Sequence, residues 1–160
     1  MYTYCGETLP PIDTPIEDSN KCYFIDEAGY IFDDAPYFSG AVYLKFYGAT
    51  GRENPLGAHF FEPNFRKLVL LKDALERIDL KPVIFDVKDN GDISVFLTSL
   101  SSSVRGPEVI LKSDADMDKV VENLQSVLDT EPLKSDFRNK YSSLIYIDLR
   151  FGNKVYYKFK

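Results

Sequence analysis

PVIFDVKDNGDISVFLT, residues 82–98, decides the fold class, because it contains two strand-forming runs on either side of a tight turn. Both runs are rich in Val, Ile and Phe, residue types that favour strands. Asn90 and Gly91 lie between them, and Asn-Gly between such runs is the strongest short-range signal for a β-hairpin. The sequence therefore predicts an antiparallel hairpin with strands at residues 82–88 and 92–98.

Further strands and two helices are expected on both sides of this hairpin. Apolar side chains recurring every three or four residues predict helices at residues 64–78 and 114–129, with Asn64 and Ser113 as their N-caps. Other strands are expected at residues 22–26, 30–32, 41–47, 108–112, 144–150 and 154–160. The expected fold class is α+β: a mostly antiparallel, mixed β-sheet with two main α-helices packed on it.

Composition and charge limit the classes of function. A hydrophobic share of 44% with 28% charged residues is typical of a folded globular domain. The net charge of −6 and the absence of a Lys/Arg stripe argue against a nucleic-acid partner, because phosphate binding draws on clustered basic side chains. No apolar run approaches the roughly 20 residues that cross a bilayer. We therefore expect a globular domain that binds no nucleic acid.

The sequence contains no recognisable catalytic or metal-binding pattern. His59 is the only histidine, so a metal site with two histidines is excluded by count. Residues 114–118 (DADMD) have the carboxylate spacing that begins a calcium loop, but Lys119 and Gln125 stand where that loop requires Gly and Glu. No phosphate-binding glycine loop is present. We therefore expect no enzymatic activity, no cofactor and no bound metal.

The segment before residue 21 differs from the rest of the chain. Residues 6–20 (GETLPPIDTPIEDSN) are rich in proline and acidic residues and show no periodicity, so residues 1–20 are expected to be an arm and residues 21–160 the folded domain. Cys5 and Cys22, the only cysteines, flank this stretch. They either form a disulfide that closes it, as in exported proteins, or are free thiols in a reducing compartment.

The last strand, residues 154–160, has one apolar face and one polar face. Val155, Tyr157 and Phe159 alternate with residues that are mostly lysine. A period of two is typical of a strand with one face packed on a core. Lysines on such a strand are typical of a sheet edge, where charge prevents unwanted pairing. The sequence therefore predicts that this strand lies at an edge of the sheet.

Two segments together resemble the bacterial FtsQ/DivIB cell-division family. Residues 146–157 (YIDLRFGNKVYY) resemble the pattern that closes the β domain of the family: an aromatic-apolar-Asp-Leu-Arg strand, a polar turn and an apolar strand. Residues 22–32 (CYFIDEAGYIF) resemble the hairpin that opens that domain. The predicted helix, Asn-Gly hairpin, strand and second helix follow in the same order. The similarity spans about residues 21–160.

The resemblance implies a divisome protein of the inner or plasma membrane, with its β domain on the extracytoplasmic side. Membrane attachment would come from segments that this chain does not contain, and residues 1–20 would be the remnant of a preceding POTRA domain. In the family the β domain is a non-catalytic scaffold to which FtsB- and FtsL-like partners add a strand. An extracytoplasmic location also favours a disulfide between Cys5 and Cys22.

The partner-binding residues that the resemblance implies lie in the C-terminal hairpin. They are Arg150, Phe151, Lys154, Val155, Tyr156, Tyr157, Lys158 and Phe159. Arg150 is expected to pair either with a partner carboxylate or with Asp148 inside the domain. The apolar members of the set either contact the partner or fill the core. The alternative function is an extracytoplasmic binding module for a small molecule or cell-wall fragment, which would use residues 48–58.

Overall fold

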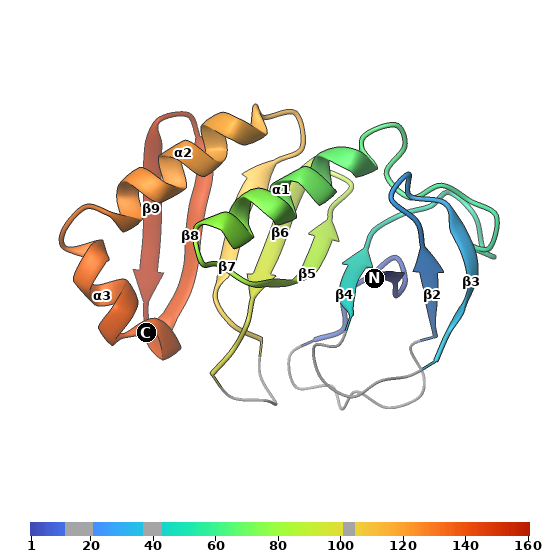
Figure 1. Cartoon of the computed structure of the whole chain (residues 1–160), viewed down its shortest axis with the longest axis horizontal. Helices are drawn as coiled ribbons and strands as arrows, with labels where there is room; N and C mark the ends of the chain where they lie inside the picture. Colours follow the sequence, from blue (N-terminus) through green and yellow to red (C-terminus); the bar gives the residue numbers. More distant parts are fainter. Residues whose placement is uncertain (12–20, 37–42, 101–104) are drawn as a thin grey trace.

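The computed structural model describes residues 1–11, 21–36, 43–100 and 105–160. Within these ranges the strands form one nine-stranded sheet, in the order β3-β2-β1-β4-β5-β6-β7-β8-β9 (Figure 1). The strands are β1 (Tyr2–Tyr4), β2 (Cys22–Ile25), β3 (Ile31–Ala35), β4 (Leu44–Tyr47), β5 (Pro82–Val87), β6 (Asp92–Leu97), β7 (Glu108–Lys112), β8 (Leu144–Phe151) and β9 (Lys154–Phe159). The helices are α1 (Phe65–Arg77), α2 (Met117–Leu128) and α3 (Leu133–Asn139), followed by a short 3-10 helix, η1 (Tyr141–Ser143).

The predicted fold class, α+β with a mostly antiparallel mixed sheet, is confirmed. The pairs β1–β4, β4–β5 and β7–β8 are parallel, and the other neighbouring pairs are antiparallel. The hairpin predicted at residues 82–98 is β5–β6. Gly91 in its turn has φ of +87°, a left-handed conformation that glycine adopts without steric cost. No helix among the described residues is long and apolar enough to span a bilayer.

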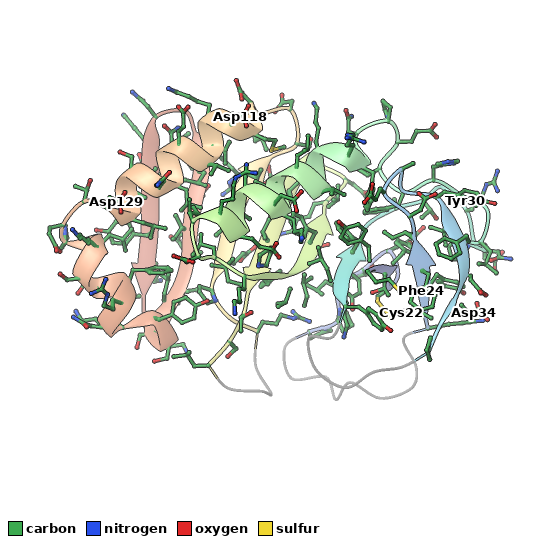
Figure 2. All side chains as sticks on the ribbon, in the orientation of Figure 1. Cys22, Phe24, Tyr30, Asp34, Asp118 and Asp129 are labelled. Atoms are coloured by element: carbon green, nitrogen blue, oxygen red, sulfur yellow. A yellow bond between two sulfur atoms is a disulfide. The ribbon has the colours of Figure 1, made fainter. Side chains whose placement is uncertain are left out.

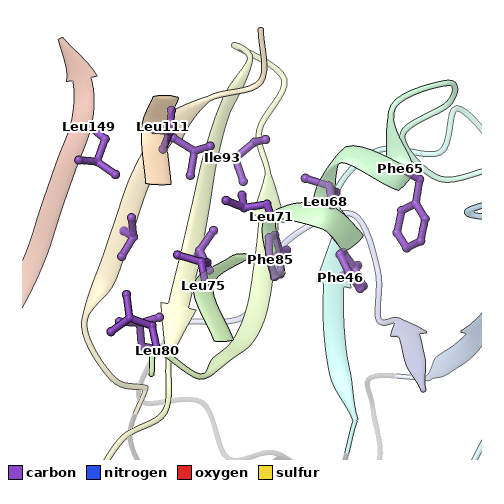
Figure 3. Close-up of a cluster of buried hydrophobic side chains, with 14 of the residues drawn as sticks. Phe46, Phe65, Leu68, Leu71, Leu75, Leu80, Phe85, Ile93, Leu111 and Leu149 are labelled. Atoms are coloured by element: carbon purple, nitrogen blue, oxygen red, sulfur yellow. The ribbon is translucent and has the colours of Figure 1, made fainter. Parts of the chain in front are cut away.

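The core lies between the sheet and a layer formed by α1 and α2, which cross one face of the sheet (Figure 1). Leu68, Leu71 and Leu75 follow one another at three- and four-residue spacing on α1 and are fully buried. They pack with strand residues such as Phe85 and Ile93 (Figure 3). Each fully buried leucine contributes about 1.5–3 kcal/mol relative to an exposed one. The predicted apolar face of the first helix is thus confirmed.

Two adjacent rows of side chains across β5–β9 distinguish the two faces of the sheet. One row faces the helices and consists of Phe85, Val95, Val109, Ile147 and Tyr157. The next row lies on the opposite face, here called the far face, and consists of Asp86, Ser94, Ile110, Asp148 and Tyr156. Successive side chains of a strand alternate between faces, so the neighbouring residues follow from these rows wherever the pairing is regular; the register shifts in β5 and β8 interrupt the alternation.

The N-terminal residues were expected in an arm outside the sheet, but the structure places Tyr2–Tyr4 inside it. β1 pairs in parallel with β4 and antiparallel with β2, so it joins the β2–β3 hairpin to the rest of the sheet. Tyr4 is buried, and its hydroxyl donates to the Gly48 carbonyl at 2.9 Å. Residues 12–20 and the start of the strand predicted at 41–47 lie outside the described residues.

Three further features differ from the expectations. Asn64 is the N-cap residue of α1, as predicted, but its side chain makes no capping hydrogen bond. Asp116, not Ser113, caps α2, because its carboxylate accepts hydrogen bonds from the Asp118 and Lys119 amides at 3.1 and 3.2 Å. α3 was not predicted at all. Its seven residues bury one leucine, Leu133, which is too little to produce a helical pattern in the sequence.

Candidate functional site

Strand β9 lies at one edge of the sheet, as its sequence predicts, and β3 lies at the other. β8 is the only strand that pairs with β9 among the described residues. The side chains of β9 alternate between exposed and half-buried along its whole length. The predicted two-residue period is therefore confirmed, and the candidate site is the free side of this strand.

The free hydrogen-bonding groups of β9 can be identified from one bond at its end. The Lys160 amide donates to the Ser143 carbonyl at 2.8 Å, so it points toward β8. Main-chain groups alternate in direction along an antiparallel strand, and both register shifts of this pair leave their extra residue on β8, so β9 itself is regular. The residues whose N–H and C=O groups point away from β8 are Val155, Tyr157 and Phe159.

Lysines dominate the far face of β9. The side chains concerned, here called the β9 lysines, are Lys154, Lys158 and Lys160. They are exposed, and they form no ion pair within the described part of the chain. Tyr156 lies between them and is 51% exposed. This strip is therefore cationic although the whole chain carries a net charge of −6.

The other edge of the sheet, β3, is protected against pairing with a further strand. A register shift interrupts its pairing with β2 next to Ile25. The amide and carbonyl of Ile31 are already bonded to Ala58 and Gly57, at 3.0 and 2.8 Å. The Asp33 carboxylate accepts from the Asp34 amide at 2.8 Å. Bulges, covering loops and charged side chains limit pairing at a sheet edge, and β3 combines all three, with the extra residue of the bulge on β3 itself, so it is a poor acceptor for another strand.

Arg150 binds two carboxylates of its own domain. Its Nε and Nη2 donate to the two oxygens of Asp148 at 2.9 and 2.7 Å, and its Nη1 donates to Asp92 at 2.7 Å. Lys112 lies 3.5 Å from the other oxygen of Asp92. Of the two roles considered for Arg150, the structure therefore shows the intramolecular ion pair. Besides the expected partner, Asp148, Arg150 binds a second carboxylate, that of Asp92.

This network has a clear electrostatic signature. Burial by itself raises the pKa of Asp148, but hydrogen bonds from Arg150 outweigh it and hold that pKa below its ordinary value. The pKa of Asp92 is shifted in the same way. Burial raises it, but the interactions with Arg150 and Lys112 lower it by more, so it too lies below its ordinary value. The pKa of Arg150 is raised by its hydrogen bonds to both carboxylates. Both carboxylates and the Arg150 guanidinium therefore remain charged at neutral pH.

Two exposed aromatic rings, one from the end of β8 and one from β9, meet near the turn between these strands. Phe151 is 54% exposed, and its ring meets that of Tyr156 edge-on with centroids 5.3 Å apart. The Arg150 guanidinium lies 5.7 Å from the Phe151 ring centroid. A cation over an aromatic face is attracted by the ring quadrupole. The ion-pair network thus orients the aromatic pair beside the β9 lysines.

The other residues considered from sequence lie away from β9. A disulfide joins Cys5 to Cys22, next to Phe24 in the N-terminal half of the sheet (Figure 2). The loop at residues 48–58 ends in hydrogen bonds to Ile31 of β3. His59 is exposed, and its ring centroid lies 5.1 Å from that of Tyr30. Among the described residues, no group of His, Cys, Asp and Glu side chains is arranged to hold a metal ion.

Asp92, which turns the expected Asp148–Arg150 pair into a network, was not predicted from the sequence. Asp92 and Arg150 are 58 residues apart, and no local pattern connects them. The signal available in the sequence was a carboxylate at the start of a strand that is otherwise apolar, which requires a partner when buried. No protein-family model matches this chain, and no curated protein matches its sequence.

Proposed function

We propose that this chain is a non-catalytic scaffold domain of the bacterial cell-division machinery that binds partner division proteins by strand addition at β9. The observation that carries the proposal is the regular, open edge of β9, with the main-chain groups of Val155, Tyr157 and Phe159 pointing away from β8. An extended segment placed there gains main-chain hydrogen bonds, and side chains at alternate positions provide specificity.

The contrast between the two edges supports β9 as the acceptor. β3 carries the extra residue of its own register shift, has a loop bonded to Ile31 and bears carboxylates, whereas both register shifts of the β8–β9 pair leave their extra residue on β8 and β9 itself regular. The FtsQ/DivIB-like pattern at residues 146–157 also ends on β9. The proposed partners are FtsB- and FtsL-like proteins.

The proposed location is the extracytoplasmic side of the inner or plasma membrane, with attachment through segments that this chain does not contain. The Cys5–Cys22 disulfide supports it, because disulfides persist mainly in oxidising compartments. The ordered network around Arg150 has a supporting role in the proposal: it fixes the end of β8, on which β9 is paired.

The test is a proline scan of the strand. Val155→Pro removes an N–H that points away from β8 and keeps an apolar side chain, so it is expected to abolish binding of FtsB- and FtsL-like extracytoplasmic segments from the same organism. Binding is measured by isothermal titration calorimetry, and folding by circular dichroism. Lys158→Pro is the contrasting variant, because its N–H faces β8 and its loss breaks the native ladder.

Charge reversal at the exposed end provides a second test that does not depend on proline. Lys154→Glu is expected to weaken binding without changing the thermal midpoint. Lys67→Glu, on an exposed position of α1, makes the same change in net charge away from β9 and serves as its control. Unchanged binding by Val155→Pro in a folded protein would refute strand addition at this edge.

A further inference from the structure

We infer that the segment accepted by β9 is one in which acidic and apolar side chains alternate. The inference rests on the proposed strand addition and adds the chemistry of the partner. It follows from the two surfaces that border the free edge, because an added strand would place its successive side chains on opposite faces of the sheet.

On the far face, the added strand would meet positive charge that the domain leaves unpaired. On this face Asp148, on the adjacent strand, and Asp92 are already neutralised by Arg150 and Lys112, and Glu108 lies two strands from β9, on β7. The β9 lysines form no such pair within the described residues. Opposite charges facing each other across strands stabilise pairing, and like charges oppose it. Partner positions on the far face therefore favour Asp or Glu.

On the helix side, the added strand would meet apolar surface. Val155, Tyr157 and Phe159 are half-buried against the core, so each still has area to cover. α2 contacts β9, and Figure 1 draws α3 beyond β9, on the side away from β8. Leu128 of α2 and Phe137 of α3 are also half-buried and apolar. Partner positions on this side therefore favour aliphatic or aromatic residues.

The spacing of the lysines sets the spacing of the acids. Lys154 and Lys158 flank Tyr156 on the same face, so acidic residues four positions apart in the partner would each face one lysine. The partner residue between them would meet Tyr156 and the neighbouring Phe151 ring. Apolar residues at the intervening positions complete the pattern. A basic segment would lose the charge pairs with the lysines, and a segment with its charges clustered at one end would match the lysines and the apolar side chains over only part of the strand.

Three fluorescein-labelled synthetic peptides test the inference against the wild-type chain. In the first, glutamate and valine alternate. In the second, lysine replaces every glutamate, and in the third the residues of the first are rearranged into a glutamate block and a valine block. Affinity is measured by fluorescence anisotropy. Amide hydrogen exchange of the ¹⁵N-labelled chain reports whether Val155, Tyr157 and Phe159 become protected.

The first peptide is expected to bind at least about tenfold more tightly than the other two, and to protect those three amides. The difference between the first and second peptides is expected to shrink as salt is added, because exposed charges are screened. Equal affinities for the first two peptides, or for the first and third, would overturn the inference while leaving strand addition intact. If all three leave the amides unprotected and the FtsB- and FtsL-like segments also do so, the proposed function itself fails.

Discussion

Replacing Arg150 with methionine removes the cation that two buried carboxylates share and keeps most of the side-chain volume. The Asp148 and Asp92 side chains are only 8% and 10% exposed, so water cannot fully replace the lost hydrogen bonds. Arg150→Met is therefore expected to lower the free energy of unfolding at pH 7 by about 3 kcal/mol, the lower end of the range for breaking a buried ion pair. We choose the lower end because the Arg150 side chain is 30% exposed.

The loss depends on pH in a direction that follows from the pKa shifts. Arg150 holds the pKa of both carboxyls below the unfolded value, so its stabilising contribution is complete above that value, near pH 4, and disappears as the pH falls through the folded-state pKa. Without Arg150, protonation relieves the buried charges. The difference between wild type and variant is therefore expected to shrink progressively below about pH 5.

The assay is urea denaturation followed by far-ultraviolet circular dichroism between pH 7 and pH 3, with the disulfide intact. Lys154→Met, which removes an exposed lysine on the same face, is the control and is expected to change stability by less than about 0.5 kcal/mol. Adding Asp148→Asn to Arg150→Met is expected to recover part of the loss. A difference that is equal at pH 7 and pH 3, or a variant as stable as the control, would show that the network is not electrostatic in origin.

Two further changes test the local structure. Asp116→Ala is expected to cost about 1 kcal/mol in urea denaturation because it removes the cap of α2, whereas Ser113→Ala, at a position that does not cap, is the matched control. A larger effect at Ser113 would contradict the cap assignment. Replacing both Cys5 and Cys22 with alanine is expected to cost about 3 kcal/mol, because the unfolded chain regains the freedom that the disulfide removes. Reducing the wild type in the same assay checks this value, and the reductant is expected to leave the double variant unchanged.

Local patterns predicted the C-terminal part of the fold well. The Asn90-Gly91 turn and its apolar flanks specify β5 and β6 within a few residues, so no distant contact is needed to recognise them. β9 was predictable both as a strand and as an edge, because the alternation of apolar residues with lysines lies within a single short segment of the sequence. The residues of the candidate edge could therefore be named before the fold was known.

Features that depend on distant contacts could not be predicted in this way. β1 is three residues long, too short to show a period, and its place is set by β2, β4 and the disulfide. Asp92 resembles an ordinary turn residue until Arg150 is brought to it from β8. The N-cap of α2 was misplaced because several oxygen-bearing side chains precede the helix, and only the backbone geometry selects Asp116.

The unequal edges of the sheet determine the stoichiometry of any assembly built on it. A molecule able to pair at both rims can polymerise without limit, each copy joining the next. Here the rim formed by β3 is blocked by its own loop and carboxylates, so a strand docked on β9 ends the growth of the sheet. The expected product is a closed one-to-one complex, and a high local density of this domain would increase occupancy without producing fibres.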